Sequence, residues 1–490
     1  MRRALLVWNQ IIPTASRNLS VRPLAAIFCR NGAYNEAHLS INPGGIGMPQ
    51  ATFRFPTGFL WGAATAAHQV EGNNTNNNWS AWEQGEGNII HGDRSGQACD
   101  WWQGGRWKED FDRAAETGQN AHRMSIEWSR IQPAEDRWDE DALDHYREII
   151  RGMFERGLTP MVTLHHFTDP LWLTEKGGWE FDGVVELFAT FTRRVVEALK
   201  EYVPYWITIN EPNVYTYSGY LGGGFPPNHN NIGAAAIVMA NLLRGHAAAY
   251  RTIHAIQPGA RVGYAHHHRP MRPAKPGFPP DMWAARFLSK NWNDSFADGI
   301  TSGRFNFILH SVAVPEARGT QDFVGLNYYS VEMVTFRPLA FDNFFHSRSF
   351  PKGPAMSESN FIANVPYGLF ESLRWAKRFN LPILVTENGV EDSKDTLRPR
   401  YIAEHVHQMW RATNFNWQIK GYFHWSLVDN FEWERGWSQR FGLWGLDAAT
   451  QTRIRRPSVD LYEAICRQNA LSYDMVERYA PQSIPVIFPD

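Results

Sequence analysis

Two short segments of the chain each place a glutamate directly after a run of apolar residues. Ile-Thr-Ile-Asn-Glu-Pro-Asn contains Glu211, and Leu-Val-Thr-Glu-Asn-Gly contains Glu387. Hydrolysis of a glycosidic bond needs one carboxylic acid to protonate the leaving oxygen and a second carboxylate on the other side of the sugar ring. A single glutamate in such a place more often caps a turn or forms a surface salt bridge. Two of them, each beside an asparagine, favour a catalytic pair.

The elements that would position this pair are short, mostly apolar strands. Eight candidates cover residues 59–64, 121–126, 160–165, 205–210, 261–265, 323–327, 383–387 and 421–425. Runs that are apolar almost throughout are typical of strands buried on both faces of a parallel sheet. In this order Glu211 follows the fourth strand and Glu387 ends the seventh. Both positions are carboxyl ends of strands, which is where barrels carry their active sites.

Helical patterns alternate with these strands. The clearest one begins after Asp139, a good N-cap residue, carries apolar residues at three- and four-residue steps, and ends before Gly157. Others cover residues 184–199, 234–256, 366–378, 399–411 and 459–467. Alternating strands and helices indicate a parallel sheet, and eight right-handed units can close on themselves. The prediction is an α/β fold, a single (β/α)₈ TIM barrel with long βα loops.

Two long loops interrupt the alternation. Residues 269–281 contain five prolines, and residues 338–364 are rich in Phe, Gly, Pro and Ser. They follow the fifth and sixth candidate strands, so they open onto the carboxyl-terminal face of the barrel. We expect them to form walls of the site; inert surface loops are the alternative.

Composition limits the classes of function. The formal net charge of −2 gives no reason to expect a nucleic-acid partner, and no stretch approaches the ~20 apolar residues that span a membrane. The 21 tryptophans suit a protein that stacks indole rings on sugars, although large aromatic residues mostly fill cores. The three cysteines, Cys29, Cys99 and Cys466, match no disulfide framework. They fit a reducing compartment, so we expect a cytoplasmic protein.

The first 47 residues differ from the rest. Five arginines precede the first acidic residue, Glu36, a pattern that loosely resembles a transit peptide. The alternative is that Met48 is the natural start and that residues 1–47 are an upstream extension. We favour the extension, because signals of folded sequence begin at Phe53. The expected organisation is therefore an extension over 1–47 and one catalytic barrel over 48–490.

The sequence resembles glycoside hydrolase family 1, the β-glucosidases and their relatives, from about residue 53 to residue 470. The motifs that carry the resemblance are FRFP at 53–56, FLWGAATA at 59–66, HQVEG at 68–72, MSIEWSR at 124–130, NEP at 210–212, GLNYY at 325–329, TENG at 386–389 and WSLVDNFEW at 425–433. They occur in the family's order and at suitable spacing. Such a set is highly specific, and it implies the barrel fold and a retaining mechanism.

The resemblance also implies roles for individual residues. Glu211 matches the family's general acid/base and Glu387 its nucleophile, with the two carboxyl groups about 5–5.5 Å apart, as retaining enzymes require. Arg123 and Tyr329 match the arginine and tyrosine beside the nucleophile. A cation there should lower the pKa of Glu387, whereas Glu211, near a second carboxylate and aromatic residues, should have a raised pKa. Asn210 matches the residue that binds the sugar's 2-hydroxyl.

The remaining matches would hold the sugar. These are Gln69, His166, Asn327, Trp425, Glu432 and Trp433, with Trp425 as the stacking floor. His165 and His166 are adjacent, and alignment with the family's pattern selects His166. A carboxylate at Glu432 would accept bonds from the 4- and 6-hydroxyls and would repel a 6-phosphate, so an unphosphorylated hexose is expected. The expected partner is a small β-glucoside or a cello-oligosaccharide such as cellobiose; the oligomeric state is left open.

Three departures from the family pattern concern the outer part of the site. Asn213 stands where the family often has tryptophan, Phe167 ends a run that is commonly tyrosine-histidine-tryptophan, and Glu127 replaces a smaller residue. Because of these departures, the sequence does not predict which leaving group is preferred. They do not change the predicted reaction.

No cofactor or metal is expected. The triplet His266-His267-His268 is conspicuous, but three successive residues of an extended chain cannot all face one ion. The glycines at 222–224 lack the strand and helix context of a phosphate-binding loop.

Three functions remain to be weighed. The first is an exo-β-glucosidase, with β-galactosidase or β-fucosidase side activity. The second is a transglycosylating relative, which would use the same covalent intermediate. The third is a sugar-binding relative without catalysis, of which loss of either glutamate would be the signature. Both glutamates are present.

Overall fold

The structure, a computed structural model, describes residues 51–340 and 343–489. The extension predicted over residues 1–47 and the alternative start at Met48 lie outside the described residues.

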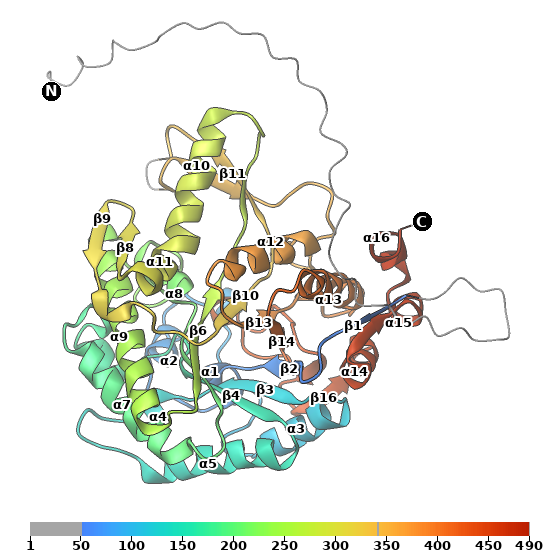
Figure 1. Cartoon of the computed structure of the whole chain (residues 1–490). Coiled ribbons are helices and arrows are strands. Elements are labelled where there is room, and N and C mark those ends of the chain that lie inside the picture. Colours follow the sequence, from blue (N-terminus) through green and yellow to red (C-terminus); the bar gives the residue numbers. More distant parts are fainter. Residues whose placement is uncertain (1–50, 341–342, 490) are drawn as a thin grey trace, which may run out of the picture. The chain divides into compact units, whose positions relative to one another are not determined.

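Eight parallel strands close into a barrel in the order β10-β13-β14-β2-β3-β4-β5-β6 (Figure 1). The strands are β2 (Leu60–Ala64), β3 (Ala121–Ser125), β4 (Thr159–His165), β5 (Tyr205–Asn210), β6 (Arg261–His267), β10 (Val324–Asn327), β13 (Ile383–Asn388) and β14 (Ile419–Trp425). Each overlaps one predicted strand, and every neighbouring pair is parallel. Every residue of β13 is buried, as are all but the first of β4 and β5, which explains their continuous apolar sequence.

A helix of eight or more residues follows each barrel strand in the chain. These are α3 (Trp107–Glu116), α5 (Glu140–Glu155), α7 (Val184–Leu199), α9 (Ile232–Ile256), α11 (Ser295–Ser302), α12 (Pro366–Lys377), α13 (Arg398–Asn414) and α14 (Ser458–Gln468). Helix α5 begins as predicted, because the Asp139 side chain accepts a hydrogen bond from the Ala142 amide at 2.9 Å. It ends before Gly157, whose φ of 73° is in the left-handed region that glycine tolerates.

Further helices and small sheets occupy the connections. The helices are α1 (Ala67–Val70), α2 (Asn78–Trp82), α4 (Trp128–Ile131), α6 (Leu171–Glu175), α8 (Pro212–Tyr220), α10 (Pro279–Ser289), α15 (Tyr473–Tyr479) and α16 (Ile484–Ile487). Small two-stranded sheets pair β1 (Thr52–Arg54) with β17 (Ala470–Ser472), β8 (Arg304–Phe307) with β9 (His310–Ala313), and β15 (Trp444–Asp447) with β16 (Thr452–Arg455).

The two long loops are not independent of each other. Strand β7 (Met271–Pro273) from the first pairs with β11 (Glu332–Phe336), which in turn pairs with β12 (His346–Ser349) from the second. Helix α10 packs on this sheet through a small apolar cluster formed by Ala284, Ala285, Leu288 and Val334. Figure 1 shows α10 and β11 together at one end of the barrel. The loops therefore form a separate layer with its own small core.

Helix α9 corrects the expectation that no segment is apolar enough to span a membrane. By length and composition alone its 25 residues could do so, with a mean hydropathy of 1.3. However, 72% of its most apolar window is buried inside the fold, where α9 packs against α7 and α8. It is therefore a core helix of the barrel; the sequence-based view missed its apolar character because Arg244 and Arg251 interrupt it.

Replacement of Gly325 by alanine should destabilise the barrel. A Cβ atom at this position of β10 would lie 2.5 Å from the carbonyl oxygen of Tyr264 on β6, so the two strands would have to separate. We expect a loss of about 1–3 kcal/mol in the free energy of unfolding, measured by urea denaturation. The matched control is Gly259→Ala, where no atom lies within 4 Å of the added Cβ, and its effect should stay within about 0.5 kcal/mol. Equal stability of the two variants would contradict this account of the strand packing.

Candidate active site

The carboxyl ends of the barrel strands surround a cavity of about 700 Å³. The predicted site residues that line it are His166, Asn210, Glu211, Tyr329, Glu387, Trp425, Glu432 and Trp433. Gln69, Arg123 and Asn327 are buried behind them and bind them through hydrogen bonds. The structure thus brings every predicted site residue to one place.

The two long loops form part of the cavity wall, as predicted. The first and its continuation contribute Arg269, Leu288 and Trp292; the second contributes Phe344, Arg348 and Phe361 among others. Three tryptophans line the cavity, namely Trp292, Trp425 and Trp433. Many of the others, including Trp61, Trp128 and Trp206, are fully buried in the core. The high tryptophan content therefore reflects core packing more than contact with a ligand.

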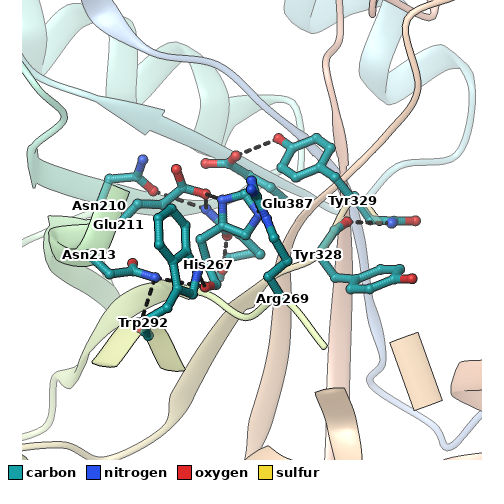
Figure 2. A network of polar contacts seen from close by, with 12 residues as sticks. Asn210, Glu211, Asn213, His267, Arg269, Trp292, Tyr328, Tyr329 and Glu387 are labelled. Atoms are coloured by element: carbon teal, nitrogen blue, oxygen red, sulfur yellow. Dashed lines mark hydrogen bonds and ion pairs between the residues drawn. The ribbon is translucent and has the colours of Figure 1, made fainter. Parts of the chain in front are cut away.

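Glu387 lies at the end of β13 and is held at both carboxylate oxygens. Arg123 of β3 donates from Nη1 to its Oε1 at 2.6 Å. The Tyr329 hydroxyl donates to its Oε2 at 2.6 Å (Figure 2). Because Arg123 is fully buried, its guanidinium needs partners on every side. It finds them in Thr163 Oγ1, the Thr386 carbonyl and Asn210 Oδ1. The carboxylate is therefore fixed in position and orientation.

Glu211 lies directly after β5 in a strained backbone conformation. Its φ of 42° and ψ of 60° are in the left-handed region, which a residue other than glycine rarely adopts. The following Pro212 begins helix α8, and the amide of Glu211 donates to the Ala265 carbonyl of β6 at 2.8 Å. This turn places the Glu211 side chain in the cavity.

A chain of amide groups connects the two glutamates. Asn210 accepts from Arg123 at 2.6 Å and from Asn327 Nδ2 at 3.2 Å, and Asn327 Nδ2 also lies 2.8 Å from Glu211 Oε1. The Thr386 hydroxyl donates to Asn327 Oδ1 at 2.6 Å, which fixes the orientation of that amide. Strands β3, β5, β10 and β13 each contribute to this network, so the geometry of the pair depends on the closed barrel.

The protonation behaviour of the glutamates is opposite to the expectation from the sequence. Burial raises the pKa of Glu387 to about 7; the charge of Arg123 opposes this shift and that of Glu211 adds to it. Burial also acts to raise the pKa of Glu211, but His267 and the hydrogen bond from Asn327 lower it overall. The expectation was wrong because these donors come from β6 and β10, which no sequence spacing connects with Glu211.

The residues expected to hold a sugar lie in the cavity wall or directly behind it. Gln69 Nε2 lies 3.2 Å from Glu432 Oε2, and burial raises the pKa of Glu432. His166 Nε2 lies 3.0 Å from Asn210 Nδ2, and its ring stacks between those of Trp425 and Trp433 with centroids about 6 Å away. Among the described residues, Gln69 Oε1 and His166 Nδ1 are buried without a hydrogen-bond partner. Such atoms are suited to bind hydroxyl groups.

The choice of His166 over His165 agrees with the geometry. His165 points away from the cavity, where its ring contacts Asp169 at 3.1 Å and Trp179 at 3.2 Å. Only His166 lines the cavity.

The three departures from the family pattern have different locations. Phe167, with a φ of 70°, lines the cavity and packs against Trp433. Glu127 is fully buried and accepts hydrogen bonds from Ser129 and Thr168, outside the cavity wall. Asn213 is also buried, and its Nδ2 donates to the carbonyls of His267 at 2.8 Å and Trp292 at 3.3 Å. Only Phe167 can contact a ligand directly.

The histidine triplet at the end of β6 faces in two directions. His266 stacks on Trp375 and His268 binds the Ser372 hydroxyl, both on α12, whereas His267 lines the cavity beside Glu211. Within residues 51–340 and 343–489 no group of three or more His, Cys, Asp or Glu side chains could hold a metal ion. His267 was missed as a site residue, although its position at a strand end, out of phase with its neighbours, could have indicated it.

An eight-stranded barrel with paired glutamates at the ends of its fourth and seventh strands defines a glycoside hydrolase. The sequence model described as Glycosyl hydrolase family 1 matches residues 51–471. The chain belongs to this family.

Individual relatives agree with the family assignment. β-Glucosidase A of Thermotoga maritima is 35% identical over 448 residues, covering 85% of this chain and 99% of the relative. A β-galactosidase of Pyrococcus woesei is 29% identical and covers 86% of this chain and 99% of its own length. Among solved structures, a β-glycosidase from Pyrococcus horikoshii has a TM-score of 0.82 at 35% identity, covering 88% of this chain and 98% of that chain.

Replacement of Tyr329 by phenylalanine should move the acidic limb of the pH–activity profile. Its hydroxyl donates to the ionised form of Glu387, so its loss raises the pKa of that carboxyl further. Because the nucleophile must be ionised, activity should be lost at a pH about one unit higher, and kcat/KM should fall roughly 10–100-fold. Steady-state rates with an aryl β-glucoside between pH 4 and 9 test this.

The adjacent Tyr328 provides the control. Its hydroxyl donates to the Val365 carbonyl at 2.6 Å and does not contact a carboxylate of the site. Tyr328→Phe should leave both limbs of the profile in place. An unshifted profile in Tyr329→Phe would show that this hydroxyl does not act on the nucleophile.

Proposed function

We propose that the chain is a retaining exo-β-glucosidase that hydrolyses terminal, non-reducing β-D-glucosyl residues. The observation that carries the proposal is the position of Glu211 and Glu387 on one cavity, with Arg123 and Tyr329 both bound to Glu387. Two oriented carboxyl groups without a metal are sufficient for double displacement at an anomeric carbon.

In the first step Glu387 attacks the anomeric carbon while Glu211 protonates the leaving oxygen. The bond to the leaving group breaks as a glycosyl ester forms on Glu387, so the charge of the nucleophile is lost. In the second step Glu211, now ionised, takes a proton from water, and the water oxygen displaces Glu387. Two inversions leave the sugar in its β configuration.

Arg123 and Asn210 support both steps in different ways. The guanidinium holds the leaving Glu387 carboxylate in place, and it also fixes Asn210 by the 2.6 Å bond to its Oδ1. Asn210 is thereby oriented toward the sugar's 2-hydroxyl. A contact with this hydroxyl that tightens in the transition state lowers the barrier.

Several features support a glucoside as the substrate. β-Glucosidase A of Thermotoga maritima is 35% identical, and a 1,4-β-D-glucan glucohydrolase of Thermotoga neapolitana is 34% identical. A structure of the Thermotoga maritima enzyme is described as a complex with glucoimidazole. Glu432 lines the cavity with Gln69 bound to it from behind, and a carboxylate in this place would bind hydroxyls and repel a phosphate. Other relatives are named β-galactosidase. Galactosides, and by the same chemistry fucosides, are therefore the secondary candidates for the substrate.

The outer part of the cavity suits an aryl or other apolar leaving group as well as a second sugar. Its wall contains Val214, Tyr217, Leu221, Trp292, Phe344 and Phe361. Transglycosylation to an acceptor alcohol in the same place would share the covalent intermediate. A purely sugar-binding role is disfavoured because both glutamates are present and held. Cytoplasmic localisation stays a prediction.

The role of Glu387 is tested by its replacement with alanine. The variant should show no measurable hydrolysis, because no group remains that can form the glycosyl ester. Added azide or formate should restore cleavage of a dinitrophenyl β-glucoside, and azide should give the α-glucosyl azide, since a single displacement inverts the configuration. The wild-type enzyme should give no azide adduct with α configuration. Unimpaired hydrolysis by the variant would exclude Glu387 as the nucleophile.

The role of Glu211 is tested by the dependence on the leaving group. In Glu211→Ala, the first step should remain fast for dinitrophenyl glucoside, whose leaving group needs no proton, but should fall about 10²–10⁴-fold for an alkyl glucoside. Pre-steady-state release of the phenol separates the two steps. Azide should here give the β-glucosyl azide. Equal losses for both substrates would contradict the role as an acid.

A further inference from the structure

Gln439 is a cavity residue with one polar atom that the protein itself does not bind. It lies in the segment after β14, lines the cavity, and is only 2% exposed. Within residues 51–340 and 343–489, its Oε1 is buried and has no hydrogen-bond partner. A buried carbonyl oxygen without a partner destabilises the fold. In a cavity wall, such an oxygen is therefore suited to accept a hydrogen bond from a ligand.

The orientation of this amide group follows from its neighbour Ser359. The Ser359 hydroxyl has a single proton, which it donates to Glu391 Oε1 at 2.5 Å. Toward Gln439 the same hydroxyl can therefore only accept, so the Gln439 atom that lies 3.0 Å from it must be Nε2. If the amide turned over, its oxygen would face the Ser359 oxygen with no proton between them. Oε1 is thus held as a free acceptor.

The backbone beside Gln439 is fixed from the side of β13. The Arg440 carbonyl accepts a hydrogen bond at 2.9 Å from the amide of Asp392, which follows β13. The next residue, Phe441, packs edge-on against the ring of Tyr329, with the centroids 6.2 Å apart. Gln439 therefore lies on the side of the β14 segment that faces β13.

The order of the barrel strands indicates which hydroxyl group Gln439 can reach. Asn210 at the end of β5 is expected at the 2-hydroxyl, and Glu432 after β14 is expected at the 4- and 6-hydroxyls. Strands β4, β3 and β2 separate β5 from β14 in the barrel. The carbons C2, C3 and C4 therefore follow one another in the direction from β5 to β14. The next strand in this direction is β13, and the next carbon is C5, which carries the hydroxymethyl group.

We propose that Gln439 is a specificity-determining residue whose Oε1 accepts a hydrogen bond from the 6-hydroxyl of the bound sugar. This inference rests on the proposed function and deepens it, because it names a part of the sugar that the site recognises. Glu432 can bind a 6-deoxy sugar through the 4-hydroxyl, whereas Gln439 adds a contact that only a complete hexose makes. A 6-deoxyglucoside or a fucoside leaves Oε1 unpaired and is therefore disfavoured.

The test compares nitrophenyl β-D-glucoside with its 6-deoxy analogue as substrates of the full-length wild type and of Gln439→Met. Methionine is similar in length but has no carbonyl oxygen. In the variant, kcat/KM for the glucoside should fall about 10-fold, as expected for the loss of one hydrogen bond. For the 6-deoxy analogue, kcat/KM should change by less than about 3-fold, because this substrate has no hydroxyl that could make the bond. Galactoside and fucoside, which also differ only at the 6-hydroxyl, should show the same change in their ratio.

Gln119 is the control for this experiment. It is also a buried glutamine whose Oε1 has no partner among the described residues, and its Nε2 also donates to a hydroxyl, that of Thr117 at 3.3 Å. Unlike Gln439, it does not line the cavity. Gln119→Met should leave both substrate ratios unchanged. Because each pair of substrates is measured with one preparation, a loss of folded protein cancels from the ratio.

The outcomes separate this inference from the function on which it rests. If Gln439→Met lowers kcat/KM equally for the glucoside and its 6-deoxy analogue, or leaves the glucoside unaffected, the inference is overturned while the enzyme remains a glucosidase. If Glu387→Ala hydrolyses glucosides normally, the proposed mechanism fails. The substrate ratio would in that case still report whether Gln439 contacts the 6-hydroxyl.

Discussion

The guanidinium of Arg123 is the interaction on which the site depends. It is fully buried, and it contacts Thr163 on β4, Asn210 on β5, and both the Thr386 carbonyl and the Glu387 carboxylate on β13. A buried ion pair gives little net stability, but removal of one partner leaves an uncompensated charge. The four strands must therefore meet at this point for the protein to fold with the cation inside. The same condition places the nucleophile correctly.

Some residues that line the same cavity have a strained backbone. Glu211, Phe167 and Trp433 all line it, and their φ values of 42°, 70° and 50° lie in the left-handed region. Each such residue costs of the order of 1–3 kcal/mol and persists only where the surroundings determine it. Here the rigid barrel fixes the backbone of these residues. The strained residues then direct their side chains to positions that a relaxed turn would not reach.

Much of this could be predicted from the sequence, for identifiable reasons. Strands such as β5 were found because burial on both faces leaves a continuous apolar run, and Glu211 was found because it follows such a run. Helix α9 was misjudged because two arginines at its surface interrupt a sequence that is otherwise apolar. The family resemblance supplied the roles of Arg123 and Tyr329, and the structure brought both to Glu387.

What could not be predicted depends on contacts between distant strands. The pKa values of the two glutamates are set by burial and by donors that arrive from β6 and β10. The directions of these pKa shifts depend on residues that are close in space but distant in the sequence. The motif around each glutamate therefore does not predict them. His267 was overlooked for the same reason, since its importance lies in the side chain it meets and not in the triplet to which it belongs.

The shared sheet of the two long loops restricts how this enzyme can be altered. Strand β11 is paired on one side with β7 and on the other with β12, and Glu332 of β11 binds Arg269 and Arg348 from the two flanking segments. Exchange of one loop for that of a relative would leave an unpaired strand edge and an unmatched charge on the remaining one. The two loops thus form one structural unit of the cavity wall. A change in the preferred leaving group therefore requires that both loops change together.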